Sequence, residues 1–167
     1  ISRDAYDISR EELEPHEQIV VTLSRGGYIK RIPASTYRNQ HRGGKGVVSM
    51  NKRDDDAVRH ILVTDTHQRL LFFTNRGRVL SLTAYELKPD TSRNTRGVPV
   101  VNVISVMDTE KISAVISRSA AEIERDSNRF LVLATRKGRI KRVALNEVAS
   151  IRPSGLIIMN LKPDDQV

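Results

Sequence analysis

The chain has 167 residues, of which 38% are hydrophobic, and carries a formal net charge of +8 at pH 7. This size and composition suit one domain with its own core, and the absence of cysteine excludes disulfides and thiolate metal sites. No segment approaches a membrane span and no signal peptide opens the chain, so we expect a cytoplasmic protein without a membrane partner.

The charge is unevenly distributed along the chain. Residues 1–17 contain two arginines and six acidic residues, a net charge of −4, which leaves +12 for residues 18–167. Within the acidic segment, Ser9 and Glu12 have the spacing of a helix capping box. We interpret residues 1–17 as an acidic linker or strap, and residues 18–167 as a strongly basic domain that attracts polyanions.

The first predicted element after this segment is a β-hairpin. Residues 19–23 are apolar and mostly β-branched, the pattern breaks at Ser24-Arg25-Gly26-Gly27, and residues 28–32 resume it. Such runs favour strands, and glycine supplies the positive φ that a tight turn requires. We therefore predict two antiparallel strands joined by a turn at Gly27.

This hairpin pattern occurs three times. Residues 70–82 and 131–143 repeat it, and the turn glycines of the three copies are Gly27, Gly77 and Gly138. Each copy is followed by a short turn or one-turn helix, at 33–37, 83–87 and 144–148, and then by a second glycine that opens another apolar strand, namely Gly46, Gly97 and Gly155. Regular recurrence of this kind predicts a repeat architecture.

An all-β unit of about 50 residues predicts radially arranged blades, because each sheet must bury a face against its neighbour. We expect about three propeller-like repeats of mostly antiparallel strands, at 18–66, 67–127 and 128–167. The last repeat stops where the first two continue into another strand, at 58–63 and 112–116, so we expect a fragment of a longer domain. Additional residues in the second repeat, Ser119–Arg125, predict a short surface helix.

Residues typical of catalytic and metal sites are not grouped in this sequence. The four histidines lack the spacing and carboxylate partners of a zinc site, and Gly43-Gly44-Lys45-Gly46 lacks the remaining features of a phosphate-binding P-loop. Asp54-Asp55-Asp56 has the pattern of a solvated turn between strands. We therefore predict no catalytic residue, no metal ligand and no cofactor in this chain.

The most distinctive stretch is a loop rich in glycine and nitrogen donors. Between Gln18 and Arg53 there is no acidic residue but eight lysines and arginines. The three glycines of the loop let its backbone lie flat against an anionic partner. This composition predicts phosphate binding. The loop consists of Gln40, His41, Arg42, Gly43, Gly44, Lys45 and Gly46, with Arg38 just before it.

Further cations recur at equivalent places in the three hairpins. The turns carry Arg25, Arg76 and Arg136 with Lys137, and Arg96 precedes the second glycine of the middle repeat. The strands that follow the turns carry Lys30, Arg31, Arg78, Arg139, Lys141 and Arg142. Outward lysines and arginines also protect strand edges, but recurrence on adjacent blades predicts a basic stripe around one rim. Aromatic residues make up only 4%, so duplex DNA held by its backbone fits better than stacked single strands.

The segment from Asp7 to Met50 resembles the start of the C-terminal domain of bacterial DNA gyrase A. Gln40 to Gly46 resembles the gyrase A box of that family, Q-R-R-G-G-K-G, with His41 where arginine is usual. The resemblance implies a β-pinwheel, in which adjacent blades exchange strands and about six blades form the full ring. It further implies that the rim wraps duplex DNA in a positive sense.

For the function, the resemblance implies a part of a type IIA topoisomerase that is not an enzyme by itself. Wrapping would let the holoenzyme, two gyrase A and two gyrase B polypeptides in the bacterial cytoplasm and nucleoid, introduce negative supercoils with ATP. The catalytic tyrosine and the ATP and magnesium sites would lie in the rest of gyrase A and in gyrase B. Two alternatives are the corresponding domain of topoisomerase IV, whose box is degenerate, and a propeller-type module that binds an acidic protein.

Overall fold

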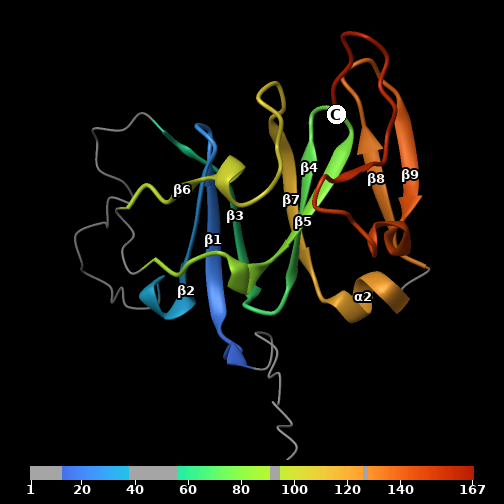
Figure 1. Ribbon diagram of the computed structural model, residues 1–167. Coiled ribbons are helices and arrows are strands. Elements are labelled where there is room, and N and C mark those ends of the chain that lie inside the picture. The colour runs from blue at the N-terminus through green and yellow to red at the C-terminus, as the bar shows by residue number, and fades with distance from the viewer. Residues whose placement is uncertain (1–12, 38–55, 91–94, 126–127) are drawn as a thin grey trace, which may run out of the picture.

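The computed structural model describes residues 13–37, 56–90, 95–125 and 128–167, which form three antiparallel β-hairpins standing side by side (Figure 1). The hairpins are β1–β2, β4–β5 and β8–β9, and all three follow the predicted segments closely. Their bounds are β1 Gln18–Ser24, β2 Tyr28–Pro33, β4 Arg69–Thr74, β5 Arg78–Thr83, β8 Phe130–Ala134 and β9 Ile140–Ala144. The all-β prediction is confirmed.

The sheets exchange strands between neighbouring repeats. The first sheet has the order β3-β1-β2-β6 and the second β10-β5-β4-β7, whereas the third contains β8 and β9. In each four-stranded sheet one edge strand comes from the next repeat. These edge strands are β6, which follows Gly97, and β10, which follows Gly155. The remaining strands are β3 Val58–Asp65, β6 Val98–Pro99, β7 Ile112–Arg118 and β10 Leu156–Ile157. This arrangement is the propeller-like, strand-exchanged architecture that was expected.

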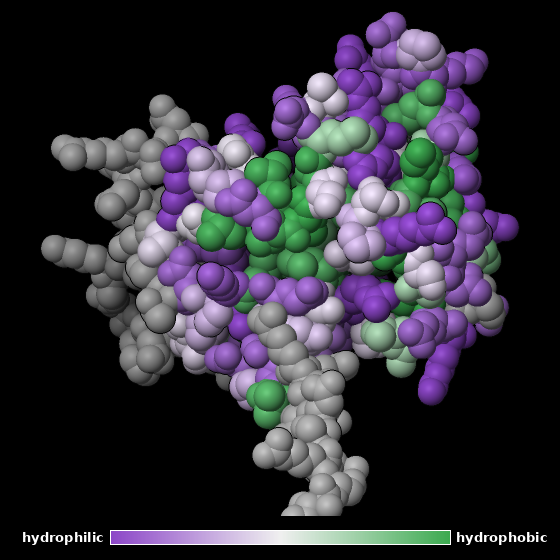
Figure 2. All heavy atoms as spheres, viewed as in Figure 1, coloured by the Kyte–Doolittle hydropathy of each residue, from purple (hydrophilic) through white to green (hydrophobic). Residues whose placement is uncertain are grey.

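The alternation of side chains along β4 joins the blades into one body. Leu70 and Phe72 point into a core shared with the first sheet, and Leu71 and Phe73 point into a core shared with the third hairpin. All four are at least 93% buried. A strand covered on both faces has a continuous apolar sequence, as here. Figure 2 shows apolar residues gathered between the first two sheets, with hydrophilic residues around them.

The exchanged strands that follow the second glycines are short, with two residues each. After Gly97 only Val98 and Pro99 join the ladder, and the chain then enters a 3-10 turn, η3 (Val100–Asn102). Proline has no N–H to donate, which limits the ladder. After Ile157, the amides of Ile158 and Met159 both donate to the carbonyl of Gly77, so the chain wraps around the second hairpin turn.

The turn glycines adopt the positive φ that the repeat pattern predicts. Gly27, Gly77 and Gly138 have φ values of 81°, 77° and 78°, and the second glycines Gly97 and Gly155 are also positive. Their surroundings differ. A Cβ on Gly77 would lie 2.2 Å from the Met159 carbonyl oxygen, whereas one on Gly138 would meet nothing within 4 Å.

This difference separates conformational strain from steric overlap. Gly138→Ala should destabilise the chain by about 1 kcal/mol, because L-residues are strained at positive φ. Gly77→Ala should cost about 3 kcal/mol, because overlap with an immobile backbone oxygen is added to that strain. Urea unfolding of both variants measures the difference, and equal losses of stability would contradict the assigned packing of the exchanged segment.

Short helical turns follow the hairpins as expected. They are η1 (Ala34–Tyr37), η2 (Ala84–Glu86) and η4 (Leu145–Val148). The predicted helix in the second repeat is α2 (Ala120–Arg125), which the side chains of Ser119 and Glu122 cap reciprocally. It is more than a surface helix, because Ile123 is completely buried in the core beneath the third hairpin.

The described end of the acidic strap docks on the domain. The Glu14 carboxylate accepts a hydrogen bond from Nη2 of Arg31 at 3.0 Å. The His16 ring stacks on His67 with centroids 3.8 Å apart and contacts the Asp65 carboxylate at 2.9 Å. The strap is therefore fixed to the first sheet and to the connection between β3 and β4. In the described ranges, no helix is long and apolar enough to cross a membrane.

Candidate nucleic-acid interface

The three hairpin turns lie at the same end of the molecule, at the top of Figure 1. Each turn presents an exposed arginine, Arg25, Arg76 or Arg136. Within the described part of the chain, the guanidinium groups of these three residues form no hydrogen bond or ion pair. Unpaired, exposed cations on adjacent turns are available to an anionic ligand.

A repeated hydroxyl–carboxylate pair shapes each of these turns. The pairs are Ser24 with Asp56, Thr74 with Glu110, and Thr135 with Asp165. In every turn the hydroxyl residue also accepts a hydrogen bond from the amide of the turn glycine, through its carbonyl oxygen at 3.0–3.1 Å. The pairs hold the three turns in one conformation and thereby place the three arginines equivalently.

The structural role of the acids in these pairs was not predicted from the sequence. Asp56 is not simply a solvated turn residue, because its carboxylate accepts hydrogen bonds from the Ser24 hydroxyl at 2.5 Å and the Gly26 amide at 2.6 Å. Asp54 and Asp55 lie outside the described residues. For Asp165, burial raises the pKa, but hydrogen bonds from the Thr135 hydroxyl and the Lys137 and Gln166 amides outweigh it and lower the pKa overall.

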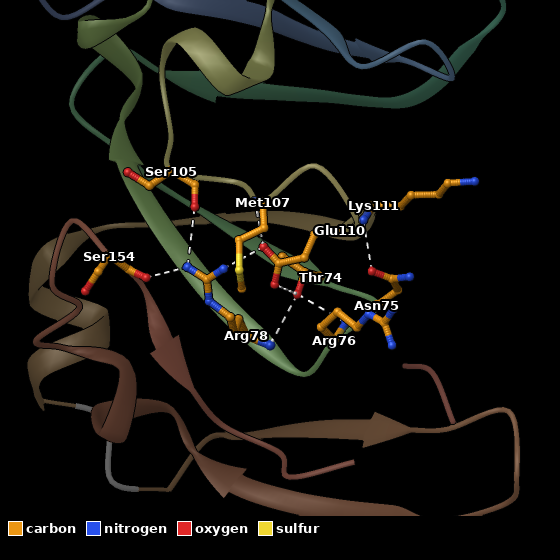
Figure 3. Close-up of polar contacts among 9 residues, drawn as sticks. All are labelled: Thr74, Asn75, Arg76, Arg78, Ser105, Met107, Glu110, Lys111 and Ser154. Carbon is orange, nitrogen blue, oxygen red and sulfur yellow. Dashed lines mark hydrogen bonds and ion pairs between the residues drawn. The ribbon is translucent and has the colours of Figure 1, made fainter. Parts of the chain in front are cut away.

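In the second blade the pair is extended by Arg78, as Figure 3 shows. Arg78 Nη1 donates to Glu110 Oε2 at 2.6 Å, and its Nη2 donates to the carbonyls of Ser105 and Ser154. The same Glu110 carboxylate accepts from the Thr74 hydroxyl at 3.2 Å and from the Met107 amide at 3.0 Å. The prediction that Arg78 lies exposed on the rim is wrong, because it is buried and links three segments of the chain.

Lys30 and Arg31 are also buried rather than exposed on the rim. Lys30 is 8% exposed and donates to the Thr95 carbonyl at 2.6 Å. Burial lowers its pKa, an effect that the nearby Asp90 carboxylate partly offsets. Arg31 is 5% exposed and pairs with Glu14, and its buried Nε and Nη1 have no partner among the described residues. These two cations hold the loop before β6 and the strap, respectively.

The cations of the third hairpin are exposed but partly engaged by backbone. Lys137 donates to the Pro163 carbonyl at 3.2 Å, Arg139 to Asn160 at 3.0 Å, and Lys141 to Ile158 at 2.6 Å. Arg142 lies over the ring of Phe130, 4.4 Å from its centroid. Strand cations thus bind neighbouring carbonyl groups, whereas the turn arginines remain available.

Two basic residues that sequence reasoning missed lie near the first turn. Arg59 and Lys111 are exposed, and with Arg25 and Tyr28 they line a groove of about 810 Å³ between the first two blades. Arg59 stands three residues after Asp56, whereas Lys111 directly follows Glu110. The two cations therefore do not occupy equivalent positions of the repeats, and the repeat pattern gave no signal for them.

Of the remaining predicted residues, the structure describes Arg96 but not Arg38 or the loop that follows it. Arg96 is exposed, and its guanidinium carbon lies 3.8 Å from the Tyr28 ring centroid. Arg38 and the whole loop from Gln40 to Gly46 lie outside the described residues. In the part of the chain that the structure covers, no three acidic or histidine side chains are grouped so that they could hold a metal ion.

Strand-exchanged hairpin units with a basic edge define a propeller-type β-repeat domain. A family model described as the DNA gyrase C-terminal domain, beta-propeller, matches residues 18–65, 68–117 and 129–167. The DNA gyrase A proteins of Staphylococcus epidermidis and Staphylococcus aureus are each 45% identical to the chain over 161 residues. The chain belongs to the family of DNA gyrase A C-terminal domains.

The matches cover 96% of this chain but only 18% of those two relatives. Among solved structures, the C-terminal domain of a DNA topoisomerase IV superposes with a TM-score of 0.67 at 27% identity, covering 91% of this chain and 44% of that one. A DNA gyrase A C-terminal domain gives a TM-score of 0.66 at 28% identity, covering 89% and 45%. The fold is therefore common to both kinds of topoisomerase.

Proposed function

We propose that the chain binds duplex DNA without sequence preference and wraps it along its basic edge, as part of a DNA gyrase A protein. The observation that carries the proposal is the set of exposed arginines, Arg25, Arg76 and Arg136, on equivalent turns of three adjacent blades, whose guanidinium groups pair with no residue that the structure describes. A polyanion that spans the blades can contact each in turn. Phosphate contacts of this kind position DNA without selecting its sequence.

Many contacts are needed because bending DNA is costly. Bending roughly 50 bp through about half a turn costs on the order of 9 kcal/mol for an elastic rod with a persistence length of ~150 bp. No single arginine supplies that energy. The turn arginines, the groove cations Arg59 and Lys111, and the loop from Gln40 to Gly46 together form a distributed site, in which the loop would anchor the wrap.

Gyrase is favoured over topoisomerase IV by sequence rather than by fold. The two structural superpositions are nearly equal, but Gln40 to Gly46 matches six of the seven residues of the gyrase A box. Wrapping would present a second DNA segment to the holoenzyme for negative supercoiling. We assign strand passage and ATP hydrolysis, with its magnesium, to the rest of gyrase A and to gyrase B, in the bacterial cytoplasm.

A salt titration of DNA binding tests this proposal. The affinity for a mixed-sequence duplex should fall steeply between about 50 and 200 mM salt, by roughly 10³-fold for about six phosphate contacts. Replacing Arg25, Arg76 and Arg136 together with alanine should lower the logarithmic salt slope by about 2.7, since each lost contact contributes about 0.9. A filter-binding or mobility-shift assay measures both.

The control removes three exposed arginines away from the hairpin turns: Arg118 at the end of β7, Arg125 on α2, and Arg129, which lies just before β8 and pairs with Glu122. This variant should leave the slope nearly unchanged. An affinity for DNA that does not depend on salt would contradict the proposal. So would weak DNA binding together with tight binding to an acidic polypeptide, which would favour the interaction-module alternative.

A further inference from the structure

The described end of the strap is bound to the domain through its backbone. The Thr66 hydroxyl group, in the connection between β3 and β4, donates to the Pro15 carbonyl at 2.7 Å and accepts from the Glu17 amide at 3.2 Å. The Thr66 amide donates to the Glu17 carbonyl at 3.0 Å, and its carbonyl accepts from the Tyr85 amide at 2.8 Å. Thr66 is 1% exposed, so one buried residue joins the strap, the connection and η2.

Side chains on both sides of Thr66 add to this contact. Nε2 of His67 lies 2.7 Å from the Glu14 carbonyl oxygen, and since a carbonyl only accepts, this nitrogen carries the proton. The His16 ring stacks on His67, and its Nδ1 contacts the Asp65 carboxylate. Burial raises the pKa of Asp65, but hydrogen bonds from the His67 amide and the His16 ring outweigh it and lower the pKa overall.

Arg31 makes release of the strap unfavourable. It lies on β2, is 5% exposed, and forms a bridge with Pro89. Among the described residues its ionic partner is Glu14, at 3.0 Å. Undocking the strap would leave a buried guanidinium without this counter-charge, which is costly. Docking is therefore the stable state of the strap rather than one of many contacts that a tether samples.

The next connection between blades is supported by a helix instead of a strap. The segment between β7 and β8 contains α2, and Ile123 of that helix is completely buried in the core beneath the third hairpin. Both α2 and the described end of the strap lie at the bottom of Figure 1. The connection between β3 and β4 has no such insertion, and the strap packs against it instead. The strap thus supports the first connection as α2 supports the second.

The docked strap and the turn arginines lie at opposite ends of the first blade. β1 begins at Gln18, directly after the strap, and ends at Ser24 in the first turn. Its 7 residues span roughly 20 Å. Changes at Thr66 should therefore leave the basic edge in place.

We propose that the docked strap is a joint that fixes where, and in which direction, the polypeptide enters the wrapping domain, and that supercoiling depends on this joint whereas wrapping does not. The inference rests on the proposed function and adds to it how the wrapped DNA is directed. The strap precedes the first blade, so it connects that blade to the rest of gyrase A. A blade held by the joint sends the duplex in one direction, whereas a blade on a flexible tether sends it in many.

The test uses a complete gyrase A protein that contains this chain, assembled with gyrase B. Thr66→Val keeps the size of the side chain but removes two hydrogen bonds to the strap. Amide hydrogen exchange at Glu17 should accelerate about 30-fold, since each lost bond corresponds to a factor of about five. His16→Ala removes the ring stack, and exchange should accelerate about 2- to 10-fold. Thr66→Ser keeps the hydroxyl group and should exchange like the parent.

Supercoiling and wrapping are then measured on the same preparations. ATP-dependent negative supercoiling should slow in the order of strap exchange, most for Thr66→Val, less for His16→Ala and not for Thr66→Ser. Wrapping is measured as the linking number of a nicked plasmid sealed while the protein is bound. All three variants should give the linking number of the parent, and the same salt slope of duplex binding.

The outcomes separate this inference from the proposed function. A parent that leaves the linking number unchanged overturns the proposed function and the joint with it. If the parent wraps DNA and Thr66→Val exposes the strap but supercoils like the parent, wrapping stands and the joint is overturned. Loss of wrapping in Thr66→Val also overturns it, because the joint would then not be separate from the basic edge. His16 is 72% exposed, so His16→Ala keeps the test decisive if Thr66→Val does not fold.

Discussion

Replacing Glu110 with alanine should destabilise the protein by about 3–5 kcal/mol, the usual cost of removing one partner of a buried ion pair. The Glu110 side chain is completely buried and lies 2.6 Å from the Arg78 guanidinium, which is 11% exposed. Without the carboxylate, the Arg78 charge remains in the interior with only backbone carbonyls as partners. The Thr74 hydroxyl and the Met107 amide also lose their acceptor.

Chemical denaturation of Glu110→Ala beside Glu124→Ala measures this effect. Glu124 lies exposed on α2, so its replacement should change the free energy of unfolding by less than about 0.5 kcal/mol. Equal stability of the two variants would mean that the Arg78–Glu110 network does not hold the second blade to the exchanged segment.

Much of the fold could be predicted from local patterns. The turn glycines were recognisable because three hairpins repeat the same break between β-branched runs, and a left-handed turn residue is favoured there. The helix at Ser119–Arg125 was recognisable as an insertion relative to the first repeat. Burial of Ile123 was not, because it depends on packing against the third hairpin.

The positions of the charged side chains could not be predicted in this way. Lys30 and Arg78 lie on strands whose outer neighbours, β6 and β10, come from the next repeat. Local sequence describes β2 and β5 as edge strands with outward cations. Strand exchange covers them, and the same cations then bind backbone carbonyls of the incoming segment.

The repeated hydroxyl–carboxylate pairs were visible but not recognised. A serine or threonine stands three residues before each turn glycine, at Ser24, Thr74 and Thr135. Its acidic partner lies about 30 residues later, towards the end of the same repeat. The pair therefore closes a loop within one blade, and closing a loop of this length has a moderate entropic cost. Comparing the three repeats position by position would have indicated the pairing.

The largest functional effect is expected from the loop between Gln40 and Gly46. In a complete gyrase, replacing Arg42 and Lys45 together with alanine should largely abolish ATP-dependent negative supercoiling. Relaxation of supercoiled DNA and binding to a duplex should remain substantial, because the turn arginines still attract the phosphate backbone. Supercoiling, relaxation and salt-dependent binding assays on the same preparation measure the three properties separately.

Arg118 and Arg125, replaced together, provide the control with the same loss of charge. They lie on β7 and α2, away from the hairpin turns, and their variant should supercoil like the parent. If the Arg42 and Lys45 variant also supercoiled like the parent, the loop would be an ordinary basic surface loop rather than an anchor.

Wrapping itself is tested most directly by the linking number that the protein imposes on DNA. Gyrase containing this chain is bound to a singly nicked plasmid without ATP, the nick is sealed with ligase, and the topoisomers are separated on a gel after the protein is removed. Positive wrapping along the basic edge predicts a linking number that rises with the amount of enzyme bound. Full binding at low salt with topoisomers identical to those formed without enzyme would contradict the wrapping function.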